Sequence, residues 1–158
     1  MDMLRSSILG KEFVNYRKTT VKDQRLRFSE RVRMQGIGNI PIVLDSVDKE
    51  ITEALCYRER RNRVYGKETI MHMDKRVSDV LKEARILLLQ ADREDIAMSK
   101  IQIGLESGVI LDPTDDLGTL YKKYRNVDDK ILYLLITKEM TILGYIKSII
   151  SYLFNLRS

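Results

Sequence analysis

The sequence contains no tryptophan, and it has one cysteine, one histidine and two prolines among its 158 residues. The single cysteine, Cys56, excludes an internal disulfide and suits a reducing compartment, so we expect a cytoplasmic protein. With only His72 and Cys56 available, no set of residues at zinc-ligand spacing is present. We therefore expect no metal site and no cofactor.

Long apolar runs and phosphate-binding glycine loops are also missing. No segment approaches the ~18 consecutive apolar residues of a membrane span, and the N-terminus lacks the apolar core and cleavage site of a secretory signal. Gly36-Ile37-Gly38 alone predicts a turn. Charged neighbours could lower the thiol pKa of Cys56, but no histidine lies near it in sequence. We expect no enzymatic activity and no catalytic residues.

The charge is unevenly distributed. The formal net charge is +5 and the pI is 9.3. Basic residues gather in two clusters, which are Lys11, Arg17, Lys18, Lys22, Arg25, Arg27, Arg31 and Arg33, and then Arg58, Arg60, Arg61, Arg63 and Lys67. Such surfaces attract nucleic acid, anionic lipid or acidic peptides through the same long-range field. A solvated basic face that aids solubility remains the alternative interpretation.

Hydrophobic patterning predicts an α+β fold in one domain. Apolar spacing favours one or two helices over residues 11–35, a helix over 74–89 capped by Asp74 or Ser78, and a short helix over 117–124. Strands are predicted over 39–45, 67–73, 100–111 with a turn at 106–108, and 131–136. Residues 48–54 predict a helical turn. The continuous apolar run Ile131–Ile136 is typical of a central strand.

This order of elements is also that of the ubiquitin-like β-grasp fold, with a helical extension in front. We expect residues 1–35 to form an N-terminal helical extension packed on the core. Residues 36–144 would form the β-grasp domain, and residues 145–158 a C-terminal extension that a protease could remove.

Four stretches carry a family pattern in the same order along the chain. They are residues 30–33 followed by 41–45, Asp74 with 77–85, Leu117-Gly118-Thr119-Leu120-Tyr121, and Asp128-Asp129 with Leu132-Tyr133. They resemble, in turn, the basic helix and P-V-I-V-E strand, the central helix, the M-G-x-L-Y motif and the acidic turn of one family. That family is the autophagy ubiquitin-like modifiers typified by GABARAP and microtubule-associated light chain three. The resemblance covers residues 13–144.

The resemblance implies conjugation through a C-terminal glycine. In the family, a processing cysteine protease exposes the glycine, and activating and carrier enzymes then transfer it to phosphatidylethanolamine on the autophagosomal membrane. Gly144 matches this position, although Leu143 stands where the family usually has an aromatic residue. A glycine that serves as a hinge or helix cap is the alternative. The apolar segment 145–158 could be a packed amphipathic helix, an interfacial anchor or a cleaved propeptide.

The resemblance also implies capture of aromatic-x-x-aliphatic peptides from receptors or adaptors, as a strand added along residues 68–72. The first peptide pocket would use Val32, Pro41, Val43, Ile70 and Ile131. The second would use Met71, Val80 and Leu81. The basic flank would use Arg31, Arg33 and Lys67, because Glu68 stands where the family usually has lysine. Singly, each apolar residue is also an ordinary core residue.

Two other functions stay open. A basic nucleic-acid-binding module would use arginines beside Tyr16, Phe28, Tyr57 and Tyr65, although no recognised binding motif is present and we expect no nucleic acid as partner. A sibling modifier conjugated to protein instead of lipid would share the fold and the glycine. Family members act mainly as monomers, and we expect the same here.

Overall fold

A four-stranded mixed sheet forms the centre of the protein. The computed structural model describes residues 21–59 and 66–157, so residues 1–20 of the predicted extension and the basic residues Arg60, Arg61 and Arg63 lie outside it. The strand order is β2-β1-β4-β3. The strands are β1 (Asn39–Asp45), β2 (Lys67–His72), β3 (Ile101–Gly104) and β4 (Leu132–Lys138).

The two most apolar strands lie side by side in the middle of this sheet. β1 runs parallel to β4 and antiparallel to β2, whereas β3 pairs antiparallel with the other side of β4. Pro41 is tolerated in a central strand because the parallel pairing with β4 begins one residue later, at Ile42. The predicted α+β, β-grasp arrangement is confirmed, and so are the predicted strands, except that the one predicted over residues 100–111 ends at Gly104, with an isolated bridge between Gly104 and Ile110.

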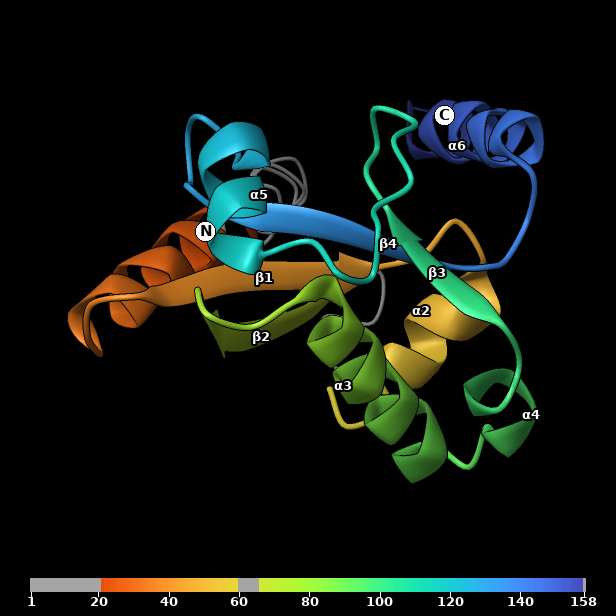
Figure 1. Cartoon of the computed structure of the whole chain (residues 1–158), viewed down its shortest axis with the longest axis horizontal. Helices are drawn as coiled ribbons and strands as arrows, with labels where there is room; N and C mark the ends of the chain where they lie inside the picture. The colour runs from red at the N-terminus through yellow and green to blue at the C-terminus, as the bar shows by residue number, and fades with distance from the viewer. Residues whose placement is uncertain (1–20, 60–65, 158) are drawn as a thin grey trace, which may run out of the picture.

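One face of the sheet carries the main hydrophobic core. Alternate residues of β1 and β4 point to this face, where they pack against α3 (Val77–Gln90) and its neighbours α2 (Lys49–Leu55) and α4 (Glu94–Ala97). Figure 1 shows these three helices together on one side of the sheet. The short helix α5 (Leu117–Tyr124) contributes Leu117 and Leu120 to the same core.

The opposite face is covered by two helices that come from the two ends of the described chain. Residues 21–34 are helical, and Phe28 and Val32 pack there against Val43 and Ile131. Helix α6 (Ile142–Arg157) covers Leu135, against which its Tyr145 and further apolar side chains pack. Figure 1 shows α6 on the side of the sheet opposite α2, α3 and α4. Residues 145–157 therefore form a helix packed on the domain in the full-length chain.

The start of α3 differs from the prediction. The helix begins at Val77, and neither Asp74 nor Ser78 caps it; instead the Asp79 carboxylate accepts a hydrogen bond of 2.9 Å from the Arg76 N–H. Arg76 forms a backbone bridge with Asp116, and the Leu117 N–H donates to the carbonyl of Lys75. This pairing holds residues 75 and 76 extended, so the helix cannot begin at residue 74.

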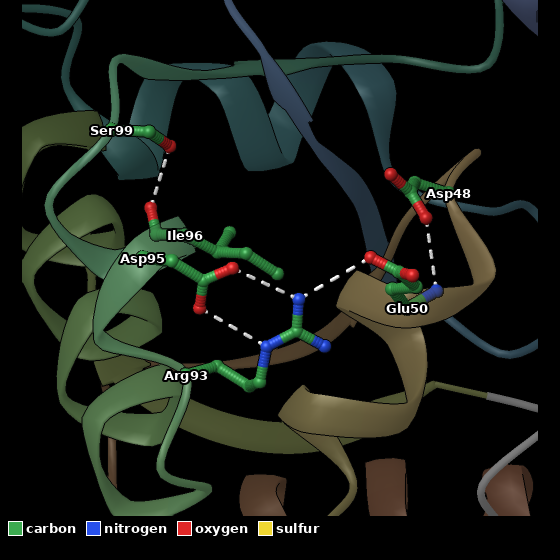
Figure 2. Close-up of polar contacts among 6 residues, drawn as sticks. All are labelled: Asp48, Glu50, Arg93, Asp95, Ile96 and Ser99. Carbon is green, nitrogen blue, oxygen red and sulfur yellow. Dashed lines mark hydrogen bonds and ion pairs between the residues drawn. The ribbon is translucent and has the colours of Figure 1, made fainter.

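The loop after α3 is tied to α2 through a single arginine. Arg93 donates to both carboxylate oxygens of Asp95 at 3.1 Å and to Glu50 at 3.3 Å, as Figure 2 shows. Glu50 lies in the first turn of α2, whose N-cap Asp48 accepts from the Glu50 N–H. The two carboxylates raise the pKa of Arg93 above its ordinary value. These contacts join the start of α4 to the first turn of α2.

Candidate functional site

The outer edge of β2 is an open sheet edge. β2 pairs with β1 on one side, and among residues 21–59 and 66–157 no strand pairs with its other side. An edge of this kind leaves backbone N–H and C=O groups available to an added strand. The segment 68–72, which the sequence predicts as the docking strand, lies on this edge.

The five residues predicted for the first pocket lie on one face of the sheet. The register pairs Pro41 with Ile70 and Val43 with Glu68. Because side chains alternate along a strand, Pro41, Val43 and Ile70 share one face, together with Glu68. Val32, Val43 and Ile131 belong to one hydrophobic cluster beneath the helix at residues 21–34. The structure thus brings the predicted residues to one face of the sheet from four separate parts of the sequence.

Phe28 fills the space between that helix and the sheet. It is buried, with 3% of its surface exposed, and it packs on Val32, Val43 and Ile131, which are 0–1% exposed. Ile70 is the exposed member of the predicted set, at 40%. Phe28 therefore fills the space in which the first pocket was predicted.

The second predicted pocket lies on the other face, beside the main core. Met71 pairs in register with Ile40, a core residue, and Met71 and Leu81 are partly buried against that core. Val80 is fully buried in it. Met71 and Leu81 can offer surface to a ligand as the structure stands, whereas Val80 supports them from beneath.

The predicted basic flank is divided between free and paired groups. Arg31 and Arg33 are exposed, and the Arg31 guanidinium lies 5.9 Å from the centre of the Phe28 ring. Lys67 forms an ion pair of 2.6 Å with Glu59. Arg31 and Arg33, on the helix at residues 21–34, are therefore the more exposed positive charges of the predicted flank.

Gly144 lies in the first turn of α6. Its N–H donates to the side-chain oxygen of Thr141 at 3.1 Å, and the Tyr145 N–H donates to the Thr141 carbonyl at 2.8 Å. Tyr145 is 0% exposed, and its hydroxyl donates to the Leu105 carbonyl at 3.0 Å. Its ring occupies the place where a Cβ on Gly104 would lie, so glycine is required there. The peptide bond after Gly144 is thus held in helical form by a buried anchor.

The isolated nucleophile and base candidates have structural roles. His72 accepts a hydrogen bond from the Asp74 N–H. The expectation that charged neighbours lower the Cys56 pKa is wrong, because burial, followed by Glu59 and Asp45, raises the pKa of the thiol to about 11. The part of the chain that the structure describes contains no group of three His, Cys, Asp or Glu residues able to hold a metal ion.

Comparison with known proteins gives a match at the level of structure. No family model matches the chain, and no curated protein matches it. The crystal structure of Trypanosoma brucei ATG8 matches with a TM-score of 0.50 and 18% identity, over 75% of this chain and 89% of that chain. This chain has the Atg8 fold. Plasmodium falciparum Atg8, in complex with an Atg3 peptide from the same organism, matches with a TM-score of 0.49 and 16% identity, over 74% and 89% of the two chains.

Sequence reasoning missed two residues at the edge of this Atg8 fold. Arg25 reaches across from the helix at residues 21–34 and forms an ion pair of 2.8 Å with Glu68 on β2, where the two side chains are 8% and 16% exposed. Phe28 closes the first pocket from the same helix. The signal in the sequence is Glu68 itself, because an acidic residue on an otherwise apolar face of a strand indicates a basic partner on the element packed against it.

Proposed function

We propose that this chain is an autophagy-type ubiquitin-like modifier that binds short aromatic-x-x-aliphatic peptides and is joined to phosphatidylethanolamine through Gly144. The observation that carries the proposal is the open edge of β2 in a chain with the Atg8 fold. An apolar cluster lies on each face of the sheet. The motif at residues 117–121, which resembles M-G-x-L-Y, supports the same assignment. Its partners would be receptor or adaptor peptides and the conjugation enzymes.

The peptide would add to β2 as a further strand. Residues 68–72 would hydrogen-bond to its backbone, and its aromatic side chain would enter the cluster beside Ile70 once Phe28 moves aside. Its aliphatic side chain would pack on Met71 and Leu81. Arg31 and Arg33 would favour acidic residues next to the motif. Because Glu68 is paired with Arg25, it repels such acidic residues less than an unpaired carboxylate would.

Conjugation through Gly144 requires removal of residues 145–158. Since Gly144 lies within the first turn of α6, the helix must unwind locally before a protease can bind the backbone in extended form. Trimming would also uncover Leu135, which is 1% exposed beneath α6 in the full-length chain. The trimmed modifier would therefore carry a new apolar surface on the face opposite α3.

The peptide-binding half is tested by titrating the isotope-labelled full-length protein with an aromatic-x-x-aliphatic peptide and following backbone amide signals by NMR. We expect the largest shifts at residues 68–72, with smaller shifts at Arg31 and Leu81. A matched peptide with alanine at both motif positions is the control. Shifts confined to the α6 region, or equal shifts with both peptides, would contradict the assignment of β2 as the docking edge.

A further inference from the structure

Helix α6 has a second apolar face that points to solvent. Its inner face packs on the domain through Tyr145, Ile149, Tyr152 and Leu153. Its outer residues Leu143, Ile146, Ile150 and Phe154 are 63%, 39%, 63% and 73% exposed. Their spacing of three, four and four residues aligns them along one side of the helix. We call these four residues the outer stripe.

The outer stripe is too short to span a bilayer. α6 has 16 residues, which corresponds to about 24 Å of helix and falls short of the ~20 apolar residues that a span needs. No helix in the described ranges has the length and apolar character to cross a membrane. A helix of this length with one exposed apolar side can instead lie in the plane of a lipid surface.

The charge around the stripe indicates which surface it fits. α6 contains Lys147 and Arg157 but no Asp or Glu. Lys147 also lines an open groove of about 610 Å³ between α6, the end of β4 and the start of α2. Lys49 and Lys138 line the same groove, and none of the three lysines forms an ion pair with any residue that the structure describes.

A buried polar atom adds to this evidence. Thr137 lines the same groove and is 1% exposed, and its buried side-chain oxygen has no hydrogen-bond partner among the described residues. The acidic residue in the lining is Asp48, whose carboxylate is engaged as the cap of α2. An anionic oxygen near the lysines would balance their charge, and a water or headgroup hydroxyl would satisfy the threonine.

We propose that α6 docks the full-length chain on an anionic phospholipid surface. The outer stripe enters the boundary between headgroups and acyl chains, and Lys49, Lys138 and Lys147 contact the headgroup phosphates. A second copy of the chain fits less well, because its α6 would bring further basic residues and no Asp or Glu to face the lysines. This docking needs neither conjugation nor phosphatidylethanolamine, so it stands or falls separately from the function proposed above.

The test is flotation of the purified full-length protein with phosphatidylcholine vesicles that contain phosphatidylserine and no phosphatidylethanolamine. We expect the protein to float with these vesicles and to float less as salt is raised. The double variant Ile150→Gln, Phe154→Gln should lose at least about tenfold in binding, since two apolar side chains no longer enter the lipid. Lys147→Glu should also weaken binding.

Matched controls come from α3. Ile86→Gln with Leu89→Gln removes two residues that are 48% and 49% exposed, and Lys82→Glu reverses an exposed charge; both should bind like the wild type. Absence of wild-type flotation, or equal losses in the α6 and α3 variants, would overturn the proposal. So would a dimer mass by light scattering that the α6 double variant returns to monomer, because the stripe would then belong to a second copy.

Discussion

The Arg25 guanidinium lies 2.8 Å from the Glu68 carboxylate, and this ion pair joins the helix at residues 21–34 to the edge strand β2. The same helix carries Phe28, which closes the first predicted pocket. This ion pair and the packing of Phe28 and Val32 join the helix to the sheet. If peptides bind as proposed, access to the first predicted pocket is coupled to how firmly this helix stays on the sheet.

We expect the ion pair to contribute measurable coupling. Arg25→Ala or Glu68→Ala should each lower the free energy of unfolding by about 1–3 kcal/mol, because each leaves a poorly solvated charge without its partner. The double variant should lose less than the sum of the two single variants. Urea unfolding of all four proteins measures this difference. Additive losses within about 0.3 kcal/mol would show that the two residues act independently.

Opening the first pocket should strengthen peptide binding. Phe28→Ala should lower the free energy of unfolding by about 3 kcal/mol and raise affinity for an aromatic-x-x-aliphatic peptide several-fold, since a larger fraction of molecules has the pocket open. Calorimetric titration measures the affinity. Leu88→Ala, fully buried in α3 on the other face, is the control for lost stability. The same affinity gain in both variants, or none in Phe28→Ala, would contradict this role.

The buried anchor of α6 should control access to the bond after Gly144. Tyr145→Ala should speed cleavage of residues 138–147 by trypsin, because the first turn of α6 loses both its core contact and its hydrogen bond to Leu105. Tyr145→Phe should lose only about 1 kcal/mol of stability. Tyr57→Ala, at a site that is 55% exposed, should leave the cleavage rate unchanged. Equal rates for Tyr145→Ala and the wild type would show that the anchor does not hold the helix.

Much of the fold was predictable because it depends on local patterning. The apolar run Ile131–Ile136 identified the central strand, and apolar spacing predicted the short helix over residues 117–124. The structure adds its cap, Asp116, whose carboxylate accepts from the Thr119 N–H at 3.1 Å. Contacts between distant segments were not predictable. The backbone pairing of Arg76 with Asp116 delays the start of α3, and the packing of Tyr145 on Gly104 holds α6 on the domain, which the sequence left open among three alternatives. Neither contact has a signal in the neighbouring sequence.

In the candidate site, too, some features could be predicted from the sequence and others could not. The pocket residues were predicted from the family resemblance, and the register of the strands puts Val43 and Ile70 on one face. The position of Phe28 over these residues could not be predicted, because the sequence does not show which space an apolar helix residue fills. The Cys56 thiol shows a related difference. Its charged neighbours suggested a lowered pKa, whereas burial of the thiol raises it.

Cys56 should therefore react slowly with thiol reagents. Its pKa of about 11, against 9.0 for an unperturbed thiol, lowers the thiolate fraction at pH 8 by about a hundredfold, and the residue is 0% exposed. We expect labelling by an aromatic disulfide reagent to be slow in the native protein and rapid in urea. Rapid stoichiometric labelling of the native protein at pH 8 would show that the thiol is accessible and ionised.

The most direct test of the modifier proposal is intact mass after incubation of the protein in lysate of its own cell type, beside a Gly144→Ala variant. We expect the wild type to lose residues 145–158 and then gain the mass of a phospholipid, and the variant to gain none. A chain that ends at Gly144 should gain the lipid without trimming. An unchanged full-length mass for the wild type, or the same lipid gain in Gly144→Ala, would contradict conjugation through Gly144.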